Sequence, residues 1–101
     1  MKVTLKVGDA TPVAGTRVRL FGVVRPARDG RKVQIQKRLR TGRYGNVATA
    51  RLHDAGAAKS EFSLRLRVSG DAVFRARVVG DDARATGVSG TKKVDVHPRR
   101  G

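Results

Sequence analysis

Basic side chains recur at every second position in several short segments, and they are the residues of this chain whose spacing could do chemistry. In the clearest example, Arg65 and Arg67 alternate with Leu64 and Leu66. Successive side chains of a β-strand point to opposite faces, so this alternation predicts a strand with one apolar and one cationic face. Rows of guanidinium and ammonium groups on a sheet could contact the phosphate, sulfate or carboxylate groups of an anionic polymer.

The charge balance agrees with such a contact. The 101 residues contain 23 Lys and Arg against 8 Asp and Glu, a formal net charge of +15. A field of this size attracts nucleic acid, anionic envelope polymers and acidic lipid surfaces, although it says nothing about fold. A second interpretation is compositional: a GC-rich coding background enriches Arg without any ligand. The sequence leaves both interpretations open.

Metal chemistry finds little support in the sequence. There is no cysteine, which excludes disulfides and thiolate metal sites, and the two histidines are too few and too scattered for a transition-metal site. Calcium could bind Asp81 and Asp82 together with Asp29 or Asp71, if the fold brings these loops together. We prefer the interpretation that these aspartates are turn residues, because Asp is favoured in turns for its bonds to the local backbone. We predict no metal and no cofactor.

Catalytic residues are also not apparent. Glu61 is the only glutamate, and neither His53 nor His97 lies in a recognisable triad context. We therefore predict that the protein is not an enzyme and assign no catalytic residue.

The elements that must position the basic residues are short strands with turns about ten residues apart, and no helical period is visible. This pattern predicts a single all-β domain, a seven-stranded antiparallel immunoglobulin-like β-sandwich over residues 1–97, followed by a linker or tail at 98–101. The expected strands are 2–7, 16–24, 32–40, 44–52, 62–68, 72–79 and 85–96, the last interrupted near 89–90. The expected core is Val3, Leu5, Val18, Leu20, Val33, Ile35, Phe62, Leu64, Leu66, Phe74, Ala76, Val78, Val94 and Val96.

Three segments resemble bacterial immunoglobulin-like domains of the kind found in secreted and surface proteins of actinobacteria. Residues 18–26 resemble the V-x-L-x-G-x-V-x-P opening of these domains, and residues 30–36 are similar to their G-x-x-V-x-L-Q third strand. Residues 74–78 look like their Y/F-R-A-x-V sixth strand, again followed by a Gly-Asp turn. The resemblance implies a spacer or adhesion module and brings no catalytic residues.

In an immunoglobulin-like arrangement, the first, second and fifth strands share a sheet, which would bring their outward basic residues together. The predicted polyanion-binding residues are Lys2, Lys6, Arg17, Arg19, Arg65 and Arg67. Phe21 falls on the outward side of its strand, and we expect it to be partly buried near the end of the sandwich. Without a stacking aromatic, the face would contact a polymer backbone and not read bases.

The sequence thus favours a non-enzymatic spacer or adhesion module of a longer bacterial exported or surface protein. It would be a monomer or one of several tandem domains. Its partner would be an envelope polymer, a sulfated glycan or nucleic acid bound without sequence specificity. No segment is predicted to span a membrane, because no apolar run is long enough.

Two alternatives remain open. One is a cytosolic nucleic-acid-binding small β-barrel without base specificity, which the charge favours and the scarcity of aromatics disfavours. The other is a carbohydrate-binding module attached to an enzyme, against which the same scarcity counts.

Overall fold

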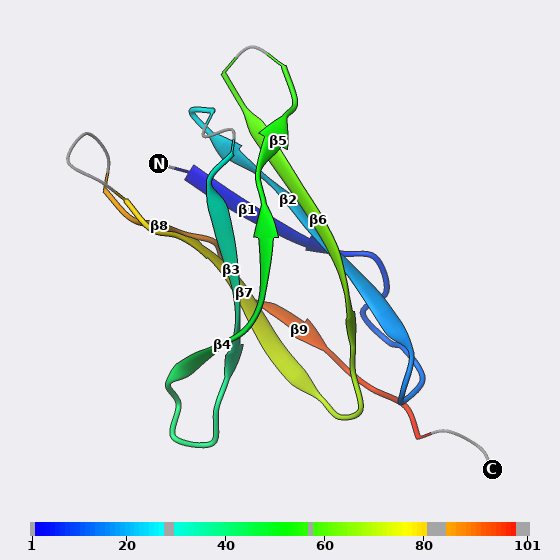
Figure 1. Cartoon of the computed structure of the whole chain (residues 1–101). Coiled ribbons are helices and arrows are strands. Elements are labelled where there is room, and N and C mark those ends of the chain that lie inside the picture. The colour runs from blue at the N-terminus through cyan, green and yellow to red at the C-terminus, as the bar shows by residue number, and fades with distance from the viewer. Residues whose placement is uncertain (1, 28–29, 57, 81–84, 99–101) are drawn as a thin grey trace.

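Two antiparallel sheets make up the part of the chain that the computed structural model describes, residues 2–27, 30–56, 58–80 and 85–98 (Figure 1). The first sheet has the order β1 (Lys2–Val7), β2 (Arg17–Arg25), β6 (Ser60–Arg67) and β5 (His53–Asp54). The second has the order β4 (Tyr44–Arg51), β3 (Lys32–Arg38) and β7 (Ala72–Val78), and β7 pairs in turn with β8 (Gly87–Val88) and β9 (Lys92–Val94). The predicted all-β, antiparallel class is confirmed. Within these residues, no helix is long and apolar enough to cross a bilayer.

The described residues form nine strands where the sequence predicted seven, and two short elements account for the difference. The segment after β4 contributes the two-residue β5, which pairs with the beginning of β6. The last predicted strand is divided into β8 and β9 near Ser89. There the Ser89 backbone N–H donates to the Ala76 carbonyl at 2.8 Å, and the Ser89 hydroxyl accepts the Ala76 N–H at 2.8 Å. Ser89 thereby provides hydrogen-bond partners for the N–H and carbonyl of Ala76 in β7, at the point where the neighbouring strand is interrupted.

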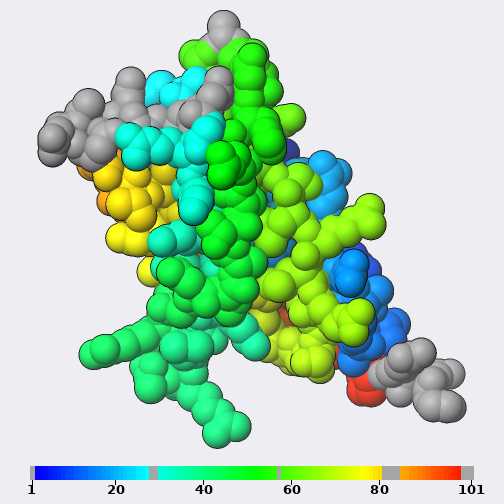
Figure 2. All heavy atoms as spheres, viewed as in Figure 1, coloured from blue at the N-terminus to red at the C-terminus, as the bar shows by residue number. Residues whose placement is uncertain are grey.

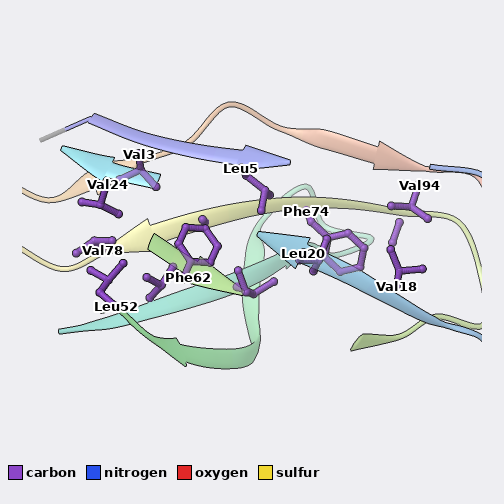
Figure 3. Packing of buried hydrophobic residues seen from close by; sticks show 14 of the residues in the cluster. Val3, Leu5, Val18, Leu20, Val24, Leu52, Phe62, Phe74, Val78 and Val94 are labelled. Carbon is purple, nitrogen blue, oxygen red and sulfur yellow. The ribbon is translucent and has the colours of Figure 1, made fainter. Parts of the chain in front are cut away.

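One hydrophobic core lies between the sheets, and Figure 3 shows the rings of Phe62 and Phe74 within it, each from a different sheet. Of the predicted core, Leu64, Leu66 and Val96 are only partly buried, and the others are buried. The core also contains residues absent from the prediction: Val24, Leu52, Val68 and Ala72. Burial of apolar side chains from both sheets supplies the main force that holds the layers together.

Gly22 lies on β2, between β1 and β6. It pairs with Leu5 on one side and with Phe62 on the other. A Cβ at this position would overlap the backbone carbonyl oxygen of Thr4 and would lie 2.8 Å from Cζ of Phe62. The absence of a side chain at Gly22 is therefore required for the spacing of the three strands.

After β1, the chain crosses from the first sheet to the edge of the second. Val13 forms a parallel bridge with His97, beyond β9. The His97 N–H donates to the Pro12 carbonyl and the Ala14 N–H donates to the His97 carbonyl, both at 2.8 Å. The Asp95 N–H donates to the carbonyl of Ala10, also at 2.8 Å. An N-terminal segment and a C-terminal segment are thus bonded directly to each other.

Candidate polyanion-binding face

The structure brings the six predicted basic residues onto one surface, the outer face of the first sheet. As predicted, the strands that carry them are adjacent, in the order β1–β2–β6. Arg17 lies directly opposite Arg67, and Arg19 directly opposite Arg65. The pairing also adds a residue that the sequence analysis did not include, because Arg25 lies opposite Lys2 on the same face. We call this set the basic face: Lys2, Lys6, Arg17, Arg19, Arg25, Arg65 and Arg67.

All seven side chains of the basic face are exposed. None of them forms a salt bridge with a carboxylate of a described residue; the ion pair found in that part of the chain joins Lys93 and Asp95, elsewhere, at 3.5 Å. Glu61 is the acidic residue on this side of β6, and it pairs with Val23 and His53. Like charges directly opposite on a sheet are destabilising by roughly 0.2–1 kcal/mol per pair. Among the described residues, the face therefore carries an excess of positive charge that a partner or counterions could neutralise.

Figure 2 gives the spatial relation of this face to the rest of the molecule. Side chains of β6 project at the right of the view beside the blue residues of the N-terminal strands, whereas the β3–β4 turn projects at the lower left. The two groups of side chains are well separated. Basic residues of that turn can therefore serve as a control surface for the basic face.

Arg19 is held in place by two contacts. Its Nε donates a hydrogen bond to the Ser63 hydroxyl at 2.9 Å, and its guanidinium carbon lies 4.5 Å from the centroid of the Phe21 ring. The second contact is a cation–π arrangement, which contributes about 0.5–1 kcal/mol at an exposed site. Arg19 is thus the most restrained cation of the face.

Phe21 differs from its prediction. It is half-buried as expected, but it lies within the face and not at an end of the domain, with Lys6 opposite on β1 and Ser63 opposite on β6. It lines an open hollow of about 430 Å³ together with Lys2, Thr4, Lys6, Gly22, Val23 and Arg25. The alternation placed Phe21 on the correct side of its strand. Its position in the sheet depends on the flanking strands, which the sequence pattern does not specify.

The outer face of the second sheet is also basic, but its arginines are engaged differently. Arg75 donates from Nε to Gln36 at 2.8 Å and stacks on the Tyr44 ring, with its guanidinium carbon 3.9 Å from the centroid. Arg77 donates to Gln34 at 2.9 Å. Both arginines are half-buried. Their donors are partly used within the protein, whereas those of Arg17, Arg65 and Arg67 on the basic face remain exposed.

The remaining candidate residues are not brought together. His53 and His97 are both exposed, the first on β5 and the second beside the crossing segment. Within the described residues, no group of three or more His, Asp or Glu is placed to hold a metal ion. Of the four aspartates considered for calcium, Asp71 accepts the Val96 N–H at 2.7 Å, and the other three lie outside the described residues.

The comparisons with known proteins identify the fold alone. No protein-family model and no curated protein matches the sequence. Among solved structures, a chicken TCR has a TM-score of 0.64 and 18% identity, over 98% of this chain and 57% of that chain. This protein therefore spans little more than half the length of that TCR chain. A superoxide reductase (neelaredoxin) from Ignicoccus hospitalis has a TM-score of 0.62 and 14% identity, over 93% of this chain and 80% of that one.

The TCR match agrees with the strand order. The first sheet, β1–β2–β6–β5, follows the ABED order of immunoglobulin domains, and β3, β7 and the β8–β9 pair follow CFG. The fold is therefore immunoglobulin-like. At these identities, neither structure carries its activity over to this chain.

Proposed function

We propose that this domain is a non-enzymatic binding module whose basic face docks anionic polymers. The observation that carries the proposal is the set of directly opposed like charges, Arg17 with Arg67 and Arg19 with Arg65, on the adjacent strands β2 and β6. A solvated face needs no such opposition, and each opposed pair costs stability in the absence of a partner. An anionic polymer lying across the strands would neutralise both members of each pair.

Two features favour the basic face over the outer face of the second sheet. Its cations are exposed and free of carboxylate partners within the described part of the chain, whereas Arg75 and Arg77 are half-buried against glutamine side chains. Its rows also extend over neighbouring strands that lie about 4.8 Å apart, so a flexible chain could contact several cations at once. Both features favour multivalent contact with a polymer over capture of one small anion.

We further propose the setting that the sequence resemblance implies: a spacer or adhesion module within a longer bacterial exported or surface protein. The immunoglobulin-like fold is compatible with this setting and with a cytosolic nucleic-acid-binding domain, but its two sheets differ from the small β-barrel of that alternative. The sequence on either side of this domain in its gene would separate them. An export signal with further copies of the domain supports the first setting, and a free-standing reading frame supports the second.

The test of docking is the salt dependence of binding to heparin and to random-sequence duplex DNA. Binding dominated by charge weakens with salt, with a slope of log K against log salt of about 0.7–0.9 per neutralised charge. A variant with Arg17, Arg19, Arg65 and Arg67 replaced by Ser should therefore reduce the slope by about 3. The control replaces four other exposed arginines, at 38, 40, 43 and 51, and thus makes the same change in net charge.

The control variant should keep most of the wild-type slope, because its cations lie outside the basic face. Equal losses in the two variants would show that bulk charge, and not this face, determines binding. Thermal melts of both variants verify that folding is intact.

A further inference from the structure

Phe21 has no role in a contact between the basic face and a polymer that depends on charge alone. It is the aromatic of the basic face, half-buried, and its strand neighbours on the same side are Arg19 and Val23. Arg19 covers the ring from one direction along β2, and the hollow extends in the other direction, toward Val23 and Arg25. Phe21 therefore forms a wall between a fixed guanidinium and an open space of about 430 Å³. Sites that hold small molecules range from about 300 to 1,000 Å³.

Cations lie on either side of the uncharged part of the hollow. Going along the paired strands, Lys2 with Arg25 form one row, Thr4 with Val23 the next, and Lys6 with Phe21 the third. Adjacent rows on one face are two residues apart, or about 7 Å. Along β2, the uncharged pair Phe21 and Val23 thus lies between Arg19 and Arg25, and along β1 Thr4 lies between Lys2 and Lys6.

This pattern matches one class of anionic polymer better than the others. A sulfated glycan or an envelope polymer carries its anionic groups on non-planar units, which can pack C–H groups on Phe21 but have no planar aromatic ring to stack on it. A single-stranded nucleic acid alternates phosphates with planar bases, and a base stacks on an aromatic ring or on an arginine plane. In a duplex the bases are already stacked on one another and are not available without unstacking.

Resting on the proposed function above, we propose that the polymer docked by the basic face is single-stranded nucleic acid. One unstacked base occupies the hollow against Phe21 and Val23. The flanking phosphates contact the cations at its two ends, Lys2 and Arg25 at one and Lys6 and Arg19 at the other. With a single aromatic on the face, binding has little sequence preference, because every base has a face that can stack.

The decisive comparison uses the wild-type protein and three probes in fluorescence anisotropy: a 20-nucleotide thymidine strand, an abasic strand of the same length and phosphate number, and a 20-base-pair duplex. The thymidine strand should bind roughly 5- to 150-fold more tightly than the abasic strand, the range for one base–aromatic stack. Equal affinity for the two strands overturns the proposal and requires no variant.

Two variants locate the stack. Phe21→Leu keeps an apolar side chain but removes the ring. It should lower the affinity for the thymidine strand by the same factor and leave the affinity for heparin within twofold of the wild-type value. Phe21→Trp introduces the sole tryptophan of the chain, and its fluorescence should be quenched by the thymidine strand and not by the abasic one. An equal loss of heparin and thymidine binding in Phe21→Leu, with an unchanged melt, would assign the hollow to glycans or to general packing and overturn the proposal.

These outcomes are separate from those of the proposed function. The four-arginine variant could reduce the salt dependence of heparin binding while the thymidine and abasic strands bind with equal affinity. In that case docking of polyanions stands and the single-strand proposal fails. If neither heparin nor the thymidine strand depends on those arginines, the docking function itself fails.

Discussion

Replacing Gly22 by Ala should unfold this domain at a markedly lower temperature, and the structure allows the cost to be worked out. The new methyl group would overlap the Thr4 carbonyl oxygen and lie 2.8 Å from Cζ of Phe62, whereas ordinary contacts begin near 3.4 Å. The phenyl ring could turn aside. The carbonyl belongs to the backbone of β1, and the N···O distance of a strand hydrogen bond varies by only about 0.5 Å. Relief of the overlap therefore requires β1 to separate locally from β2.

Overpacking of this kind costs about 1–3 kcal/mol. Loss of one neighbouring strand hydrogen bond adds about 1 kcal/mol. Alanine regains about 0.5–1 kcal/mol relative to glycine in a strand. The free energy of unfolding should thus fall by about 1–3.5 kcal/mol, and the melting midpoint by about 4–8 °C for each kcal/mol in a domain of this size.

Circular dichroism melts and urea titrations measure this loss. The control is Gly70→Ala, since a Cβ at Gly70 would have no neighbour within 4 Å and the residue does not have a positive φ. That variant should stay within about 1 kcal/mol of the wild type or be slightly stabilised. If the two variants have the same melting temperature, β1 and β2 are not as closely packed as described, and the reasoning from the Gly22 contacts is wrong.

Three further predictions concern the core, the faces and the histidines. Ser89→Ala should lower the free energy of unfolding by about 1–3 kcal/mol in urea titrations, because a buried backbone N–H of β7 loses its acceptor. Leu20→Asp should leave the domain unfolded by circular dichroism, since it places a charge in the core. Arg65→Asp should be neutral or stabilising by some tenths of a kcal/mol, because it relieves a like-charge pair; similar losses in both would refute the assignment of faces. The double replacement of His53 and His97 by Gln should leave heparin binding and the melt unchanged, and a loss of either with the fold intact would assign the histidines a role.

The alternation of apolar and basic residues was sufficient to predict most of the fold. In β2, Val18 and Leu20 are buried and Arg17 and Arg19 are exposed, as a two-residue period requires. Leu52 could not be predicted in the same way. It follows β4, whose alternation is poor, and it is buried where the chain passes from β4 to β5, with its N–H bonded to the Arg31 carbonyl and its carbonyl to the Gly30 N–H.

The candidate site contains some features that the local residue pattern predicts and others that it does not. The side of the strand on which Phe21 and Arg19 lie follows from the sequence. The stacking of the Arg19 guanidinium on the Phe21 ring, the bond to Ser63 and the hollow beside β1 all depend on which strands are neighbours and in which register. A fuller use of the predicted pairing of the first two strands would also have placed Arg25 beside Lys2 on the face.

The parallel pairing of the crossing segment with the residues after β9 has a mechanical consequence. Its three backbone hydrogen bonds join residues 10–14 to residues 95–97. In a parallel pair, the chain enters one strand and leaves the other at opposite ends, so a tension that draws those ends apart slides one strand along its partner. All three bonds then bear the load at the same time and do not open one after another. An immunoglobulin-like unit closed in this way would resist extension along its length better than peeling from one edge, and single-molecule pulling in the two geometries would measure the difference.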